Sequence, residues 1–221
     1  MRDTRTAVGQ NRILTFLVWS GLGAIIIVPI LIAAYSPYLA SRDVVYIVAG
    51  FAGIIGLGLF LLQPLLAAGY LPGPRRIQRK WHRLVGTTII VVAALHVGGL
   101  YLTSPPDTID ALLFAAPTSF SVFGVIAFWG IILTAVLVLL RRRLGLRYPA
   151  WHVLHNAIVL VVVASTVIHA LQIEGTMGTI SKLVLGGAAL VATAITLTDV
   201  RVIKPISKSR MRQATSLRTR D

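Results

Sequence analysis

All five histidines of this chain lie in two apolar stretches, and their spacing repeats. His82 and His96 share one stretch, His155 and His169 share the other, and each of these pairs is separated by 14 residues. In an α-helix of about 100° per residue, 14 steps return to within about 40° of the starting direction and cover about 21 Å. Each pair therefore lies on one face of its helix, with one imidazole near each side of a hydrocarbon core.

The elements that must position these imidazoles are transmembrane helices. Hydrophobic residues make up 56% of the 221 residues and charged residues 13%, and the mean hydropathy is +0.83. Apolar stretches of about 20 residues, each long enough to cross a bilayer core of about 30 Å, recur along the chain. The sequence predicts an all-α membrane protein, a six-transmembrane-helix bundle that occupies residues 13–200. The expected spans are 13–34, 44–70, 81–103, 118–140, 149–172 and 179–199.

The basic residues predict the orientation of this bundle. Nineteen of the 21 lysines and arginines fall in segments that share one side of the membrane, and Arg42 and Lys182 fall on the other. Such a positive-inside pattern places both termini, residues 1–12 and the basic tail 201–221, in the cytoplasm. The net charge of +14 is therefore mainly a topology signal. We expect the tail to rest on anionic membrane lipid, and we expect no nucleic-acid partner.

The third and fifth spans run in the same direction because both are odd-numbered. His82 is then level with His155 near the cytoplasmic side, and His96 is level with His169 near the outer side. Tetrahedral zinc needs about four ligands, and these two spans contain no Cys, Asp or Glu to complete such a site. A haem brings four equatorial nitrogens and needs two axial ligands. Two stacked b-type haems with histidine ligands therefore fit the number, the spacing and the apolar surroundings.

Three further polar residues lie near the predicted inner pair. His152 is about 100° out of phase with His169, so we do not expect it to be a ligand. It either bonds a haem propionate or is a spare interfacial residue. Arg83 and Arg147 lie at the cytoplasmic ends of the two helices. They either neutralise haem propionates or serve as topology charges alone.

Small and aromatic residues near the histidines have alternative structural roles. Gly86, one turn after His82, either leaves room for the edge of a ring or serves helix packing. Gly53 is expected in helix packing, because small residues let transmembrane helices approach closely. Trp81 and Trp151 are expected to act first as interfacial anchors.

Two stretches around these histidines resemble a known family. They are "KWHRLVGTTIIVVAALH" (80–96) and "RRRLGLRYPAWHVLHNAIVLVVVASTVIH" (141–169), and they resemble the ferric reductase-like transmembrane domain. That superfamily includes ferric reductases, NADPH oxidases and the haem-binding membrane subunit of the periplasmic methionine sulfoxide reductase. The resemblance covers residues 44–172. It implies two b haems, the inner one on His82 and His155 and the outer one on His96 and His169.

The resemblance also implies a route for electrons, from a cytosolic flavin through the inner haem and the outer haem to an outside acceptor. Ferric reductases and NADPH oxidases usually continue into a cytosolic FAD/NAD(P)H domain, which this sequence does not contain. We therefore expect the donor to be a separate cytosolic flavin reductase, quinol, or a flavin bound at the cytoplasmic face. The expected acceptor is a ferric chelate, oxygen or a redox protein. The expected location is the cell membrane of a bacterium or archaeon.

Two other functions are compatible with the same histidines. The chain could be a cytochrome b membrane anchor that exchanges electrons with quinone for a partner dehydrogenase. It could also be a transporter or a non-redox scaffold that uses imidazoles as proton relays. The last alternative predicts a colourless protein.

Overall fold

The computed structural model describes residues 3–145 and 147–199, and these residues form helices and no strand. Six helices are long and apolar enough to cross a membrane, as the sequence predicts. They are α1 (Asp3–Ala34), α2 (Val44–Ala68), α3 (Arg75–Thr103), α5 (Ser119–Leu139), α6 (Tyr148–Gln172) and α7 (Thr179–Thr198). The predicted all-α, six-helix fold is therefore confirmed. The predicted basic tail, 201–221, lies outside the described residues.

Two short elements lie in the connections between these helices. A 3-10 turn, η1 (Pro37–Leu39), links α1 to α2, and α4 (Pro105–Leu112) lies between α3 and α5. Proline suits the first turn of a helix because the N–H it lacks would have no intrahelical acceptor there. Asp107 lies in the first turn of α4 and accepts a hydrogen bond from the Ser104 hydroxyl.

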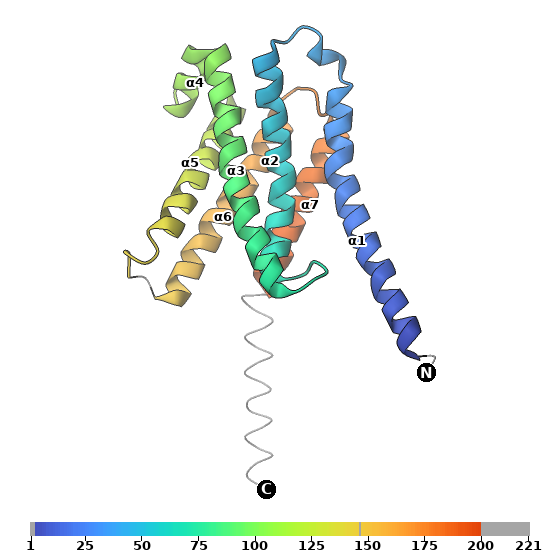
Figure 1. Cartoon of the computed structure of the whole chain (residues 1–221). Helices are drawn as coiled ribbons and strands as arrows, with labels where there is room; N and C mark the ends of the chain where they lie inside the picture. Colours follow the sequence, from blue (N-terminus) through green and yellow to red (C-terminus); the bar gives the residue numbers. More distant parts are fainter. Residues whose placement is uncertain (1–2, 146, 200–221) are drawn as a thin grey trace.

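The six long helices alternate in direction. Figure 1 shows α4 and the α1–α2 connection at one end of the bundle, and the α2–α3 and α5–α6 connections at the other. We call these the α4 end and the basic end, because the arginine-rich segments 75–83 and 141–147 lie at the second. Helices α3 and α6 both run from the basic end to the α4 end, so they share a direction as predicted.

Helix α3 begins at Arg75, six residues earlier than the apolar pattern predicts. Its first turns are strongly basic, so hydropathy alone misses them. The buried Gln78 side chain stabilises this start by donating to the carbonyl oxygens of Leu71 and Gly73, the latter at 3.0 Å. These bonds also tie the α2–α3 connection to α3.

The end of α2 is fixed at the basic end by a glycine and a tyrosine. Gly69 has a φ of 74°, the left-handed conformation that commonly ends a helix. The next residue, Tyr70, donates its hydroxyl to the carboxylate of Asp199 at the end of α7. Desolvation and the Asp199 carboxylate raise the pKa of Tyr70 to about 12. The hydroxyl therefore stays protonated, and remains a donor, throughout the physiological range.

The core lies where α2, α6 and α7 meet. Its largest contributors include Leu57 and Leu61 from α2, Val163 from α6 and Leu185 from α7. Helix α3 packs mainly on α2, and α5 packs mainly on α6, whereas α3 and α6 scarcely contact each other. The bundle therefore consists of two tightly packed pairs, α2/α3 and α5/α6, joined through α7.

Large apolar side chains cover the outside of the bundle. Phe16 is 70% exposed, Leu102 73% and Leu139 79%. An apolar surface of this extent is unfavourable in water and suited to hydrocarbon. Together with the six long apolar helices, it makes this a multi-pass membrane protein.

Close approach of α5 and α6 depends on a glycine. A Cβ at Gly130 would lie 2.4 Å from Cγ2 of Val162. We predict that Gly130→Ala lowers the stability of the purified protein, because overpacking typically costs about 1–3 kcal/mol. Thermal unfolding in detergent measures the change.

The control is Gly187→Ala in α7, where a Cβ would meet nothing within 4 Å. That variant should be neutral or stabilised by up to about 1 kcal/mol, since alanine is the better helix former. Equal stability of the two variants would contradict the packing seen between α5 and α6.

Candidate functional site

The four predicted ligands lie on the two co-directed helices, two on each. Helix α3 carries His82 and His96, and α6 carries His155 and His169. All four side chains are half-buried. His82 and His155 lie toward the basic end, and His96 and His169 lie toward the α4 end. We call them the basic-end pair and the α4-end pair.

The structure brings the two imidazoles of the α4-end pair close together. The ring centroids of His96 and His169 lie 6.3 Å apart, and the ring planes are inclined at 79°. A metal–imidazole bond of about 2.0–2.1 Å and a nitrogen-to-centroid distance of about 1.1 Å on each side give a separation of about 6.3 Å. The spacing therefore matches two imidazoles that ligate one metal from opposite sides. The scarcity of contacts between α3 and α6 means that these rings extend across the space between the two helix pairs.

Both rings of this pair are oriented by a carbonyl group of the neighbouring helix. Nδ1 of His96 lies 2.7 Å from the oxygen of Ala49 in α2, and Nδ1 of His169 lies 2.7 Å from the oxygen of Phe120 in α5. A carbonyl oxygen only accepts, so each Nδ1 must carry the proton and donate it. Nε2 then has a free lone pair, which is the state that a metal ligand requires.

The same arrangement recurs at the basic end for one of the two imidazoles. Nδ1 of His82 lies 3.2 Å from the oxygen of Gln63 in α2. Gln63 follows Ala49 by 14 residues, the separation that also relates His82 to His96. The antiparallel register of α2 and α3 therefore presents two carbonyl groups to two imidazoles at the same spacing.

A small residue exposes each of these carbonyl groups. Helical side chains tilt toward the N-terminus, so the residue four positions later overlies a given carbonyl. Four residues after the acceptors Ala49, Phe120 and Gln63 stand Gly53, Gly124 and Ala67. A Cβ at Gly53 would lie 3.1 Å from Nδ1 of His96, and a Cβ at Gly124 would lie 2.7 Å from Nδ1 of His169. These two glycines make room for the rings.

His155 is the exception among the four. Its Nδ1 is buried and has no hydrogen-bond partner in the part of the chain that the structure describes. Its ring is instead stacked on Trp151, with centroids 5.1 Å apart and planes 8° from parallel. The guanidinium of Arg141 lies 4.4 Å from the centre of the Trp151 ring. His82 lies within electrostatic range of His155 across the space between the helix pairs.

The remaining predicted residues lie at the basic end. Arg83 and Arg147 are exposed there, and their role toward propionate groups stays a prediction. His152 packs against Tyr148 and Trp151, with centroid distances of 4.3 Å and 4.7 Å. The structure therefore places His152 in an aromatic cluster at the start of α6.

Two glycines that the sequence analysis names have defined contacts in the structure. Gly53, expected in helix packing, contacts the His96 ring instead. Gly86, for which a ring edge and helix packing were both open, faces α2. A Cβ there would lie 2.9 Å from Nε2 of Gln63. Gly86 therefore serves the packing of α3 on α2.

Sequence reasoning missed the groups that position the ligands. A backbone carbonyl acceptor has no signature in the sequence. The glycines that expose two of these carbonyls, Gly53 and Gly124, can be seen in the sequence. Trp151, expected as an interfacial anchor, is 8% exposed and touches a predicted ligand. The contact between Trp151 and His155 could have been predicted from the sequence, because Trp151 lies one helical turn before His155 on the same face.

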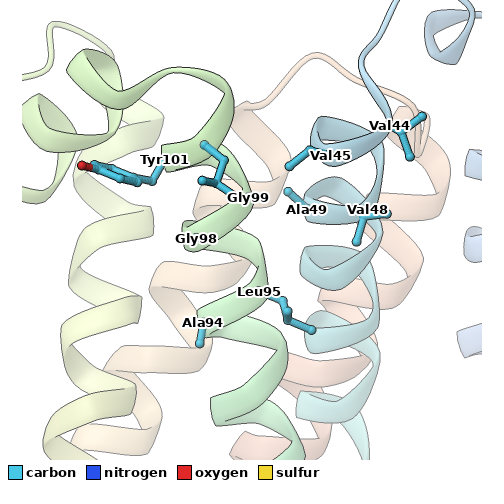
Figure 2. Close-up of a pocket in the computed structure, with 10 residues that line it drawn as sticks. Val44, Val45, Val48, Ala49, Ala94, Leu95, Gly98, Gly99 and Tyr101 are labelled. Atoms are coloured by element: carbon cyan, nitrogen blue, oxygen red, sulfur yellow. The ribbon is translucent and has the colours of Figure 1, made fainter.

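An apolar groove of about 530 Å³ lies between α2 and α3 at the α4 end. Its lining is aliphatic apart from Tyr101, and it includes Val48, Ala49, Leu95 and Gly98. Figure 2 shows that the Tyr101 ring points away from α2 and from the groove. The groove thus offers a hydrocarbon surface, and lipid acyl chains suit it.

Within residues 3–145 and 147–199, no three or more His, Cys, Asp or Glu side chains gather in a way that could hold a bare metal ion. A haem iron needs two protein ligands, and the facing imidazoles fit that requirement. Comparisons with protein-family models, curated proteins and solved structures found no match.

The two ring-facing glycines give a direct test of the site. On the expectation from the sequence that His96 and His169 hold a haem, we predict that Gly53→Ala and Gly124→Ala each reduce the haem bound per purified chain, because the added methyl displaces His96 or His169. The closer contact at Gly124 should make its variant the more severe. Pyridine haemochrome assay against protein concentration measures the ratio.

Gly50→Ala is the matched control on α2, since a Cβ there would meet nothing within 4 Å. It should retain the haem content of the unmodified chain. If Gly53→Ala retains as much haem as Gly50→Ala, the contact with His96 has no role in ligand placement.

Proposed function

We propose that this protein is a transmembrane electron conduit with two b-type haems, which carries single electrons from a cytosolic donor to an acceptor on the outer side. The observation that carries the proposal is the α4-end pair. Two imidazoles face each other at the separation of axial ligands, and each has its Nδ1 proton directed at a helix carbonyl. The two Nδ1 hydrogen bonds leave both Nε2 atoms with a free lone pair, which a pair of purely structural histidines does not require.

The chain's residues would hold the cofactor as follows. His96 and His169 would hold one haem iron, and His82 and His155 would hold the other, about 21 Å further along the helices. Haem supplies one-electron chemistry through its iron, and its potential depends on the axial ligands, their hydrogen bonds and burial. The apolar helices α2, α3, α5 and α6 exclude water from both sites. With two imidazoles holding each iron, neither iron would bind a substrate directly, so an acceptor would dock at the surface near α4.

Orientation follows from the charges. The arginine-rich segments at the basic end face the cytoplasm under the positive-inside rule, and the α4 end, with Asp107 and Asp110, faces outward. A bacterial or archaeal cell membrane is the proposed location. The donor is a separate cytosolic flavin reductase, quinol or a flavin bound at the basic end, where Arg83 and Arg147 are exposed. The acceptor is a ferric chelate, oxygen or a redox protein.

Reduction of an outside acceptor is favoured over quinone exchange at the α4 end. A quinone head group needs polar partners, and the groove between α2 and α3 is lined by aliphatic side chains with Tyr101 turned away. The resemblance of residues 44–172 to the ferric reductase-like transmembrane domain supports the same choice. The site at the α4 end therefore acts as an exit for electrons.

Absorption spectroscopy tests the proposed function. The purified chain should show a b-type α-band in the reduced-minus-oxidised spectrum, with about two haems per chain. His96→Ala and His169→Ala should each abolish one of the two haems, because an iron with one protein ligand is held too weakly.

His152→Ala is the matched control, since His152 lies on α6 but packs against aromatic rings. It should retain both haems. A colourless protein would overturn the proposal in favour of imidazoles that act as proton relays. A His96→Ala variant with unchanged haem content would overturn His96 as a haem ligand.

Membrane orientation gives an independent test. We expect a fluorescent protein fused after residue 221 to fold and fluoresce in cells, and an alkaline phosphatase fused within the 104–118 connection to be active. These outcomes follow if the basic end is cytoplasmic. The opposite pair of results would reverse the direction of the proposed electron route.

A further inference from the structure

The basic-end pair is built differently from the α4-end pair. Three of the four imidazoles direct Nδ1 at a carbonyl oxygen of a neighbouring helix. The Nδ1 of His155 is buried and finds no such partner among the described residues. Buried polar groups are nearly always hydrogen-bonded, so this exception needs an explanation.

The register of α5 and α6 explains why the carbonyl is missing. The acceptor for His169 is Phe120, and the α5 position 14 residues further on, level with His155, is Thr134. Four residues after Thr134 stands Val138, where the other three acceptors are followed by Gly53, Gly124 and Ala67. At this level α5 therefore has a branched residue where the other three acceptors are followed by a glycine or an alanine.

Trp151 occupies the role that the carbonyl has elsewhere. It lies four residues before His155 on the same face of α6, and its indole is stacked flat on the imidazole. The indole is itself 8% exposed, and the Arg141 guanidinium lies over it at 4.4 Å. A flat stack fixes the plane of the His155 ring, but it gives Nδ1–H no acceptor.

We propose that Trp151 is the positioning residue for His155. We further propose that the two haem sites differ in midpoint potential, because His155 has a ring stack where the other three imidazoles have a hydrogen bond. The inference rests on the proposed haem ligation. A hydrogen bond from Nδ1 raises the basicity of the ligating Nε2 and so stabilises the ferric state. The α4-end site has two such bonds and the basic-end site has one. The basic-end site therefore has the higher midpoint potential.

The charge of Arg141 acts in the same direction, since a nearby cation favours the state that has gained an electron. Outward transfer then runs from the higher-potential site to the lower-potential site. A membrane potential that is negative inside favours outward movement of an electron. The membrane potential would therefore offset the uphill step between the two sites.

Potentiometric titration of the full chain in detergent, followed at the α-band, tests the proposal. The unmodified chain should titrate in two steps, and His155→Leu should lose the upper one. Trp151→Leu should shift or weaken the upper step and leave the lower step in place. Trp151→Phe, which keeps an aromatic face, should restore the upper step. Trp81→Leu is the matched control, because Trp81 is adjacent to His82 in sequence but is 52% exposed, and it should leave both steps unchanged.

A variant that opens a new acceptor for His155 tests separately whether Val138 accounts for the missing hydrogen bond. Val138→Ala should open the Thr134 carbonyl to His155 and lower the potential of the upper step alone. Val136→Ala, two residues away on α5 and so on another face, should change neither step.

The outcomes separate this inference from the proposed function. A chain without haem overturns the proposed function itself. If the chain binds two haems but His169→Leu loses the upper step, the inference is overturned and the proposed function stands. The same holds if the upper step is the same in Trp151→Leu and Trp81→Leu.

Discussion

The hydrogen bond from an imidazole Nδ1 to a carbonyl of the neighbouring helix is the interaction on which the site depends. A helix carbonyl already accepts from the N–H four residues later, but its oxygen has a second lone pair that an imidazole can use. The net worth of such a bond is about 0.5–1.5 kcal/mol. Its larger effect is chemical, since it fixes the tautomer and turns Nε2 into a free donor of electrons. Ala49 and Phe120 do this for the α4-end pair, and Gln63 does it for His82.

This interaction explains how the bundle is divided. Each histidine-bearing helix has an acceptor helix beside it: α3 packs on α2 and α6 packs on α5, whereas α3 and α6 scarcely touch each other. The core of α2, α6 and α7 holds the two pairs together. The imidazoles can then reach toward each other across the space between α3 and α6. Helix α3 buries few side chains, namely Gln78, Val85 and Ile89. Helix packing alone does not explain why they are so few.

The sequence predicts the framework well because its signals are strong. Six apolar stretches predict the six long helices, and the recurrence of a 14-residue spacing predicts the facing of His96 and His169. The start of α3 at Arg75 was missed because hydropathy does not register a basic amphipathic turn. The acceptor carbonyls were missed because a backbone group has no identity in sequence, and only the register of two helices shows which carbonyl meets which ring. Trp151 was missed because its position at a helix start also suits an interfacial anchor. The cofactor itself remains a prediction from ligand number, geometry and tautomer.

Electron paramagnetic resonance of the oxidised protein at low temperature tests the central claim most directly. The claim is that His96 and His169, whose ring planes are inclined at 79°, would together hold one haem iron. Near-perpendicular imidazole planes on one ferric haem give a strongly anisotropic low-spin signal, and the account predicts that signal in the unmodified chain and its loss in His96→Ala. A high-spin signal alone in the unmodified chain, or no ferric haem signal at all, would contradict the account.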